Sequence, residues 1–237
     1  NLCRRKIIRR KTYKAFTKIK NDVIIPLFSN LLILNKGCFM KKMILNNYGS
    51  FDLTFVKGKN ATMWDAKGKK YIDFISGIGV NCLGHNYKPL VREIAKQAKK
   101  QIHISNYYFS YIVLVYADEL LKVTGFEKGY FGNSGAEANE AAIKLARKYG
   151  QLNGGEKRKT IVTLEKSFHG RTLATLTATG QNKFHPECFA PYPEGFKTIK
   201  ANDYEAIKTA FDDTTAAFFV ECIQGEGGVN LLDPAWV

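Results

Sequence analysis

Residues 131–137 join a glycine-rich turn directly to a helix start, which is the combination in this sequence best suited to bind an anion. Ser134 and Glu137 have the spacing of a capping box, so the helix is expected to begin at Ser134 with Gly135 and Ala136 as its first residues. Those small side chains leave backbone N–H groups open, and the positive end of the helix dipole lies behind them. The turn is therefore predicted to bind a phosphate group.

This turn alone does not identify a ligand, because most helix starts bind only water. It has neither the G-x-x-x-x-G-K-[ST] pattern of a nucleotide P-loop nor the G-x-G-x-x-G pattern of a dinucleotide site. Two other segments carry groups that could contribute to the same site. Residues 167–171 contain His169 and Arg171, and residues 221–228 begin with Glu221. A lone histidine or arginine is usually a surface group, so the position of these segments in the fold decides whether their side chains belong to a site.

Both segments follow apolar runs, at residues 160–164 and 215–221, that predict buried strands of a parallel sheet. An unpaired carboxylate at the end of such a strand is costly, which favours a role for Glu221 in a site. The carboxyl ends of parallel strands share one edge of a sheet, and ligands bind there. The turn and the two segments are therefore expected to converge.

The pattern of the remaining residues predicts the elements that position these groups. Within the helix that begins at Ser134, apolar positions from Ala138 to Tyr149 mark one helix face, and Glu140 is expected to pair with Lys144. The fold class is predicted to be α/β, a mainly parallel sheet covered by helices with a small N-terminal β segment. The other expected elements are a β meander at 53–57, 62–65 and 71–74, a short strand at 129–131, and helices at 89–101, 111–123 and 203–211.

The formal charge of +15 does not describe the whole chain, because residues 1–42 hold twelve Lys or Arg and one acid. The remainder is close to neutral, so a nucleic-acid partner is not expected for the body of the protein. The five cysteines show no C-x-x-C pair and no histidine at zinc spacing, which predicts reduced, intracellular thiols and no metal site. The longest apolar run, at 23–34, is too short for a membrane span.

Three motifs, in this order along the chain, resemble those of the class III aminotransferases, which are fold type I enzymes that use pyridoxal 5'-phosphate. The short stretches at 83–85 and 105–106 fit the same family. The motifs are Asn133–Arg147, Ser167–Leu173 with Ala178–Gln181, and Ile223–Val229.

The resemblance implies a role for each candidate residue. Arg171 resembles the clamp for a substrate carboxylate, a task that suits the planar fork of arginine. Glu221 is expected near the cofactor and the amino end of the substrate, and Glu226 is expected to be structural. The residues implied to hold the cofactor are Ser134, Gly135 and Ala136 at its phosphate, Phe168 and His169 beside its ring, and Glu221.

The resemblance also implies three regions along the chain. Residues 1–42 are expected to be a basic extension outside the fold, and residues 43–88 a β and loop segment. Residues 89–237 are expected to be the large domain that binds pyridoxal phosphate, incomplete at its C-terminus. The lysine that forms a Schiff base with the cofactor is expected beyond Val237, since Lys144, Lys166 and Lys183 are poorly placed to replace it.

The implied function is transfer of an amino group from N-acetylornithine, or a similar ω-amine, to 2-oxoglutarate in arginine biosynthesis. The resemblance further implies small-molecule amino acid and 2-oxo acid substrates, a cytoplasmic homodimer, and a chain that is inactive by itself because it is the N-terminal part of the enzyme. The alternative is a non-catalytic chain that binds a phosphate ligand or a partner protein and works without the missing lysine.

Overall fold

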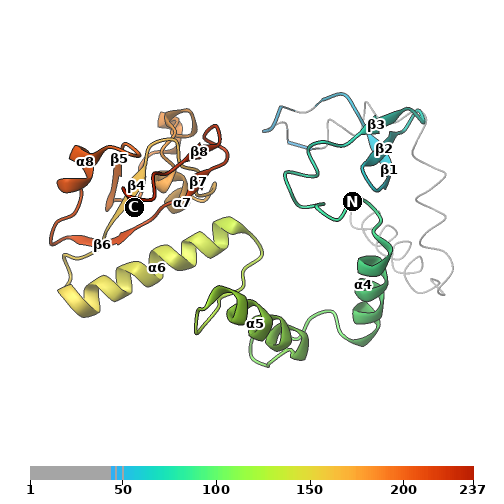
Figure 1. The fold of residues 1–237 in the computed structure, drawn as a ribbon, viewed down its shortest axis with the longest axis horizontal. Coiled ribbons are helices and arrows are strands. Elements are labelled where there is room, and N and C mark those ends of the chain that lie inside the picture. Colours follow the sequence, from blue (N-terminus) through green and yellow to red (C-terminus); the bar gives the residue numbers. More distant parts are fainter. Residues whose placement is uncertain (1–43, 46, 50) are drawn as a thin grey trace, which may run out of the picture. The chain divides into compact units, whose positions relative to one another are not determined.

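The computed structural model describes residues 44–45, 47–49 and 51–237. They form two compact units, of which the first ends at Tyr108 and the second begins at Phe109 (Figure 1). The basic extension predicted at 1–42 lies outside the described residues, and the division predicted at residue 88 stays a prediction.

The first unit contains a three-stranded antiparallel sheet in the order β1-β2-β3, which confirms the predicted meander. The turn between β2 and β3 is fixed by Asp65, whose Oδ1 accepts hydrogen bonds of 2.9 Å from the backbone N–H groups of Lys67 and Lys69. The helix predicted at 89–101 is present, with Pro89 in its first turn. The elements of this unit are β1 (Phe55–Lys59), β2 (Thr62–Asp65), β3 (Lys70–Ile72) and α4 (Lys88–Lys100).

The second unit is built on a parallel sheet in the order β5-β4-β6, as the sequence predicted. A two-stranded antiparallel pair, β7 and β8, follows it. The strands are β4 (Thr160–Leu164), β5 (Phe196–Ile199), β6 (Thr215–Phe218), β7 (Ile223–Gln224) and β8 (Asn230–Leu231). The helices are α5 (Tyr111–Thr124), α6 (Gly135–Gly154), α7 (Leu173–Ala178), α8 (Tyr204–Lys208) and the 3₁₀ turns η1 (Asn182–Phe184) and η2 (Glu187–Phe189).

Two strand predictions were wrong. Residues 129–131 form no strand, because no described segment pairs with them; the ring of Phe131 instead lies 5.7 Å from that of Tyr116 on α5. The strand predicted at 215–221 ends at Phe218. The backbone N–H of Phe219 still donates to Val162 O at 2.8 Å, and the chain then leaves the sheet, so Glu221 lies in the following loop.

The sheet of the second unit is covered on both faces. On one face Val162 and Leu164 of β4 pack with Ile199, Ala210, Leu232 and Trp236, and residues of α8 border this cluster. On the other face α6 approaches closely at Gly150, where an added Cβ would lie 2.9 Å from the Cβ of Ala216. Figure 1 shows α6 running beside the strands. Central strand β4 is therefore buried from both sides, which explains its continuous apolar sequence.

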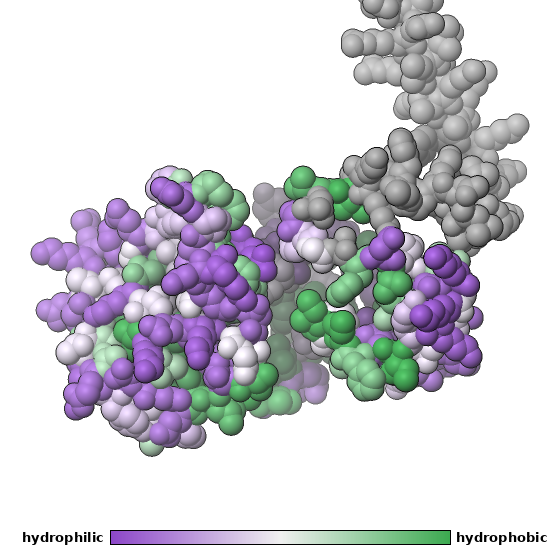
Figure 2. All heavy atoms as spheres, turned by 90° about the horizontal axis from the view of Figure 1, so that it is seen from above, coloured by the Kyte–Doolittle hydropathy of each residue, from purple (hydrophilic) through white to green (hydrophobic). Residues whose placement is uncertain are grey.

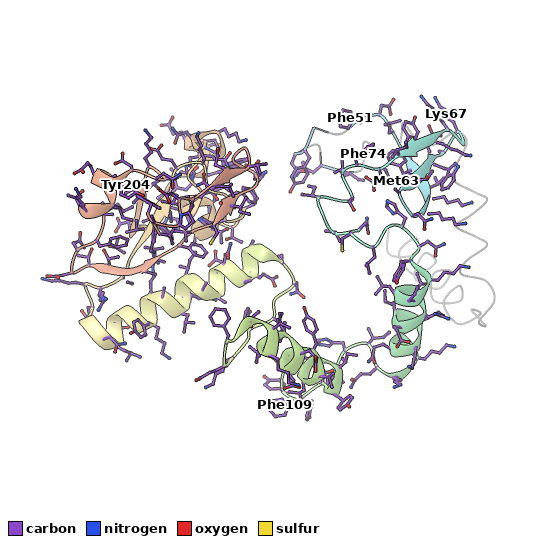
Figure 3. The ribbon with its side chains drawn as sticks, viewed as in Figure 1. Phe51, Met63, Lys67, Phe74, Phe109 and Tyr204 are labelled. Carbon is purple, nitrogen blue, oxygen red and sulfur yellow. The ribbon has the colours of Figure 1, made fainter. Side chains whose placement is uncertain are left out.

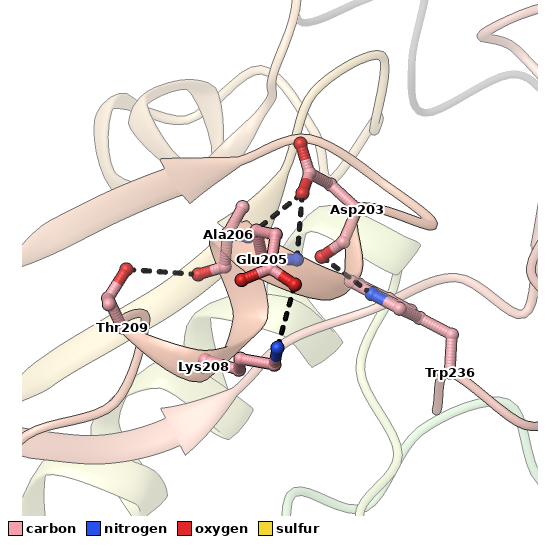
Figure 4. Close-up of polar contacts among 6 residues, drawn as sticks. All are labelled: Asp203, Glu205, Ala206, Lys208, Thr209 and Trp236. Atoms are coloured by element: carbon pink, nitrogen blue, oxygen red, sulfur yellow. Dashed lines mark hydrogen bonds and ion pairs between the residues drawn. The ribbon is translucent and has the colours of Figure 1, made fainter.

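The start of α8 anchors the C-terminal residues to this core (Figure 4). Asp203 caps the helix, accepting hydrogen bonds from the backbone N–H groups of Glu205 at 3.1 Å and Ala206 at 2.9 Å. These bonds, led by that of Ala206, lower the pKa of the Asp203 carboxyl. Trp236 donates its indole N–H to the carbonyl oxygen of Asp203 at 2.9 Å, so the buried ring is also fully hydrogen-bonded.

Helix α6 begins where the sequence predicted, but its buried face is different from the predicted apolar one. Ile143 and Gly150 are the buried residues of the helix, whereas Leu145 is 70 % exposed and Tyr149 is 58 % exposed. At Gly150 the helix comes so close to its neighbours that an added Cβ would clash with the carbonyl oxygen of Arg158. Packing distance, and not side-chain hydropathy, sets this face.

Apolar side chains lie on the surface of both units (Figure 2). Phe74 in the first unit is 91 % exposed and Phe109 in the second is 87 % exposed; Figure 3 labels both. Helix α5 has no buried residue, although its sequence is largely apolar. Among the described helices, none combines the length and apolar character that a membrane crossing requires.

We predict that Gly150→Ala lowers the free energy of unfolding by about 1–3 kcal/mol, because the new methyl group meets the backbone carbonyl of Arg158 and the methyl of Ala216. Gly135→Ala is the matched control on the same helix, since a Cβ added there would meet no atom within 4 Å. That change is expected to leave stability unchanged or raise it by less than about 1 kcal/mol. Urea unfolding measures both, and equal effects would contradict the close packing at Gly150.

Candidate functional site

The start of α6 has the capped and open geometry that the sequence predicted. Ser134 is the N-cap, and its Oγ accepts the backbone N–H of Glu137 at 3.2 Å. The Glu137 carboxylate reaches back to the backbone N–H of Asn133 at 2.6 Å, one residue earlier than in a standard capping box. A Cβ added at Gly135 would meet no atom within 4 Å. The first-turn N–H groups of Gly135 and Ala136 are therefore accessible from outside the helix.

The loop at 167–171 is attached to the first two turns of α6. Asn139 donates its side-chain amide to the carbonyl oxygen of His169 at 2.7 Å. Farther along, Thr172 donates its hydroxyl to the Glu140 carboxylate, so the predicted pairing of Glu140 with Lys144 is wrong. Glu140 turns to the loop because a hydroxyl donor lies there, whereas a lysine one turn away reaches only solvent.

Gly170 makes this attachment possible. Its φ of +133° lies in the region that favours glycine, and an added Cβ would lie 2.9 Å from the Cβ of Ala136 and 2.6 Å from Oγ1 of Thr175. The loop backbone therefore lies directly against the first turn of α6. The predicted phosphate site and the predicted ring and carboxylate residues are thus parts of one local structure.

His169 is buried, with 4 % of its surface exposed. Its ring stacks on that of Phe219, with centroids 4.3 Å apart, and its backbone N–H donates to Thr179 Oγ1 at 2.9 Å. The ring atom Nε2 is buried and has no hydrogen-bond partner. Burial lowers the pKa of His169 to about 4, so the imidazole is neutral at pH 7.

Phe168 and Glu221 meet although 53 residues separate them in the sequence. The Glu221 carboxylate accepts the backbone N–H of Phe168 at 2.9 Å. Burial raises the pKa of the Glu221 carboxyl, the charge of Glu226 raises it further, and the bond from Phe168 opposes both. The loop at 167–171 is therefore hydrogen-bonded at two places. Asn139 of α6 binds it at His169, and Glu221, after β6, binds it at Phe168.

Arg171 is exposed and lies against two aromatic rings. Its Cζ is 4.4 Å from the ring centroid of Phe184 and 5.6 Å from that of Phe168. The two rings are 5.7 Å apart in an edge-to-face arrangement. No ion pair joins Arg171 to a carboxylate in the described part of the chain, so its N–H donors are available to a ligand.

A second group of contacts connects this loop to residues 224–227. Gln181 donates its amide to Ser167 O at 3.1 Å and to the Glu226 carboxylate at 2.6 Å. Lys183 lies 3.7 Å from the same carboxylate. Glu226 is thus held by structural partners, in agreement with the role predicted for it. Gln224, 1 % exposed, donates to Glu165 O at 2.8 Å, while its Oε1 has no partner.

Direct contacts bring Ala136, Phe168, His169 and Glu221 together, and Arg171 joins them through the ring of Phe168. Four of the residues that make these contacts lie within the family motifs but had no role assigned to them, and two lie outside the motifs. A buried threonine or a helical asparagine has no pattern that distinguishes it from a core or surface residue, so only the fold identifies them. They are Asn139, Thr172, Thr179, Gln181, Phe184 and Phe219.

No group of three or more His, Cys, Asp or Glu within the described ranges could hold a metal ion. The polar groups of the site are instead N–H donors, one neutral imidazole, one arginine and one carboxylate with a raised pKa. Such a set is chemically suited to an organic anion, because a helix start attracts phosphate and an arginine attracts carboxylate.

We predict that His169 makes stability fall as the pH drops from about 6.5 to 4. Below pH 6.5 an unfolded histidine binds a proton, whereas the buried ring stays neutral down to a pKa of about 4. The neutral ring contributes on the order of 3 kcal/mol to the free energy of unfolding. This contribution is complete above pH 6.5 and is lost below pH 4. His169→Phe keeps an aromatic ring without a titrating nitrogen.

Urea unfolding at pH 4.5 and 7.5 measures this effect. The difference between the two pH values should shrink in His169→Phe and stay as it is in His103→Gln, which replaces an exposed histidine. An unchanged difference in His169→Phe would show that the buried ring is not the group responsible.

Comparison with known proteins agrees with this geometry. The family model described as aminotransferase class-III matches residues 43–237. Acetylornithine aminotransferase from Caldanaerobacter subterraneus is 46 % identical over 199 residues, which are 84 % of this chain and 50 % of that protein. The corresponding protein from Wolinella succinogenes is 48 % identical over 195 residues, 81 % of this chain and 49 % of the relative. The chain spans about half the length of the curated relatives it matches.

Solved structures give the same result for the fold. Ornithine aminotransferase from Toxoplasma gondii matches with a TM-score of 0.81 and 27 % identity over 92 % of this chain and 52 % of its own. N-acetylornithine aminotransferase from Stenotrophomonas maltophilia matches with a TM-score of 0.65 and 35 % identity over 81 % of this chain and 47 % of its own. The fold is that of the fold type I aminotransferases. The chain belongs to the class III aminotransferase family.

Proposed function

We propose that this chain provides the cofactor-phosphate and substrate-carboxylate parts of an aminotransferase site. The observation that carries the proposal is the hydrogen bond from Asn139 to the carbonyl of His169, because it places the anion site of α6 beside the loop that carries Phe168 and Arg171. A transaminase needs these two functions next to each other, since the substrate must lie over the ring of a cofactor whose phosphate is held nearby.

The residues at the site fit pyridoxal 5'-phosphate. The exposed first turn of the 20-residue helix α6 offers Ser134, Gly135 and Ala136 to the phosphate, with no side chain over Gly135. Phe168 offers a partly open ring to an aromatic neighbour, and His169 has a buried Nε2 without a partner. When bound, this cofactor withdraws electrons from the carbon that bears the substrate amine, which lets a proton leave that carbon.

The other residues act on the substrate and on the loop. Arg171 binds a substrate carboxylate through its free N–H donors. Glu221 holds the backbone of Phe168 and offers a carboxyl group near the amino end of the substrate. Its raised pKa allows this group to hold or release a proton closer to neutral pH than an ordinary glutamate does. His169, neutral at pH 7, adds no charge beside the cofactor.

We assign the lysine that links covalently to the cofactor to none of Lys144, Lys166 and Lys183. All three side chains are exposed, and Lys183 pairs with Glu226. A nucleophilic lysine needs a lowered pKa, which comes from burial or from a nearby cation, and an exposed lysine beside a carboxylate has neither.

The proposed reaction is transfer of an amino group from N-acetylornithine, or a similar ω-amine, to 2-oxoglutarate in arginine biosynthesis. The names of the two curated relatives reported above support N-acetylornithine as the amino donor. The arginine clamp supports a carboxylate in both the amino donor and the 2-oxo acid acceptor. We further propose a homodimer in the cytoplasm. The tests of activity below use a protein of the relatives' full length that contains this chain, called the full-length protein.

We predict that Gly135→Asp weakens binding of pyridoxal phosphate at least tenfold, because a carboxylate on the first turn repels the phosphate and covers its N–H donors. The position is open, so the change should leave the fold intact. Gly135→Ala is the control with a small uncharged side chain, and it should have a smaller effect. Equilibrium binding is measured with the full-length protein by absorbance.

Binding of pyridoxal, which lacks the phosphate, provides the second comparison for this variant. Gly135→Asp should affect pyridoxal much less than pyridoxal phosphate. If Gly135→Asp weakened the binding of both ligands equally, the phosphate would not lie at the start of α6 and the proposed phosphate site would be wrong.

We predict that Arg171→Ala lowers kcat/KM for acetylornithine by about tenfold to a few hundredfold in the full-length protein. A charge-assisted, two-bond contact with a carboxylate is worth about 1.5–3 kcal/mol, and 1.4 kcal/mol corresponds to a factor of ten. The kcat/KM of Arg171→Lys should lie between those of the original protein and Arg171→Ala, since lysine keeps the charge and loses the planar fork. Cofactor affinity should change little, because the helix start binds the phosphate independently.

The matched control is Lys157→Ala, which removes an exposed cation from the turn after α6. Steady-state kinetics should show no change in that variant. If Arg171→Ala keeps the full kcat/KM, or loses cofactor affinity in place of substrate affinity, the assignment of Arg171 to the substrate carboxylate is wrong.

A further inference from the structure

Arg171 poses a physical problem for a residue that must bind a carboxylate with defined geometry. An exposed arginine side chain retains much of its rotamer freedom, which a bound substrate would have to remove. In the described residues, Arg171 has no carboxylate partner, and its neighbours are the rings of Phe184 and Phe168.

The nearer ring belongs to a turn that is fixed to the same loop. Phe184 ends η1, where its backbone N–H donates to Gln181 O at 3.0 Å. Gln181 in turn donates its side chain to Ser167 O at 3.1 Å. The next residue, His185, contacts Leu176 O through Nε2 at 2.6 Å. Phe184 is therefore held in place relative to the backbone that carries Arg171.

An aromatic ring holds an arginine in a way that suits ligand binding. A cation–π contact uses no hydrogen-bond acceptor, so all five N–H donors of the guanidinium stay available and its charge is not neutralised. An acidic neighbour would occupy donors and compete with the substrate. Glu226 does not do so, because Gln181 and Lys183 occupy its carboxylate at 2.6 and 3.7 Å.

We propose that Phe184 is a positioning residue, which holds the guanidinium of Arg171 ready for a substrate carboxylate. The inference rests on the proposed function, since it assumes that Arg171 binds that carboxylate. Phe184 acts on the substrate only through Arg171, and its ring also lies 4.7 Å from Nζ of Lys183. Phe168 also contacts the arginine, but its ring lies farther from Cζ, at 5.6 Å compared with 4.4 Å for Phe184.

The test uses the full-length protein and glutarate, an unreactive dicarboxylate that reports carboxylate binding without turnover. Phe184→Leu removes the ring and keeps an apolar side chain. It should raise the dissociation constant of glutarate, measured by calorimetry, about two- to fivefold, as expected for an exposed cation–π contact. KM for 2-oxoglutarate should rise by a similar factor while kcat stays close to its original value. Phe184→Tyr keeps a ring and should retain the original affinity.

Phe189→Leu is the matched control, because it makes the same change on the neighbouring turn η2, at a ring without a cation contact. Thermal unfolding and cofactor absorbance confirm that each variant is folded and loaded. If Phe184→Leu does not fold, Phe184→Met, which fills more of the same volume, replaces it. Equal affinity for glutarate in the original protein and the folded variant without the ring would overturn the proposal.

A double-mutant cycle separates positioning from general packing. In the Arg171→Ala background, Phe184→Leu should have no further effect on glutarate affinity, since the residue it acts through is gone. Additive losses would overturn the proposal and assign Phe184 an independent role. If Arg171→Ala weakens glutarate binding and Phe184→Leu does not, only this inference fails. If Arg171→Ala has no effect, the proposed function of Arg171 fails and this inference fails with it.

Discussion

The hydrogen bond from the Asn139 amide to the carbonyl of His169 joins the two halves of the candidate site, and the other contacts of the site depend on it. It spans 30 residues of sequence and lies between a helix start, which attracts anions, and a loop with an aromatic and an arginine side chain. Because the bond is made by a side chain of α6 and the backbone of the loop, the loop cannot shift without losing it. One helix therefore carries both the candidate phosphate site and the attachment of the loop that holds Arg171.

Close backbone contact reinforces this arrangement. At Gly170 the loop lies against Ala136 and Thr175, where any larger residue would push the loop away from the helix. At Gly150 the other end of α6 lies against the carbonyl of Arg158 beside the sheet. Helix α6 is thus fixed at both ends by positions without a side chain. Dense packing at these points makes the helix a rigid support for the groups at its N-terminus.

Within the part of the chain that the structure describes, Arg171 has no carboxylate partner. Glu221 binds a backbone N–H, and Glu226 is occupied by Gln181 and Lys183. His169 is neutral because burial disfavours its charged form. Arg171 therefore faces solvent with its full charge, supported by aromatic rings that do not neutralise it. Such an arrangement favours an external carboxylate over an internal one.

The sequence by itself determined the local elements and the capped start of α6. Ser134, Gly135 and Glu137 specify a capped helix start through contacts within a few residues, and the apolar run at 160–164 specifies a buried strand. These features depend on local hydrogen bonds and on burial, both of which leave a pattern in the sequence. The family motifs added the roles of Arg171 and Glu221.

Only the tertiary structure decided which surfaces and side chains meet. The buried face of α6 follows Ile143 and Gly150, although hydropathy pointed to Leu145 and Tyr149, because the sheet requires close backbone approach at Gly150. The contacts of Asn139 and Phe184 could not be predicted from the sequence for a related reason. Their effect comes from contacts with residues distant in the sequence or on another turn, and a single asparagine or phenylalanine carries no periodic signal of such contacts.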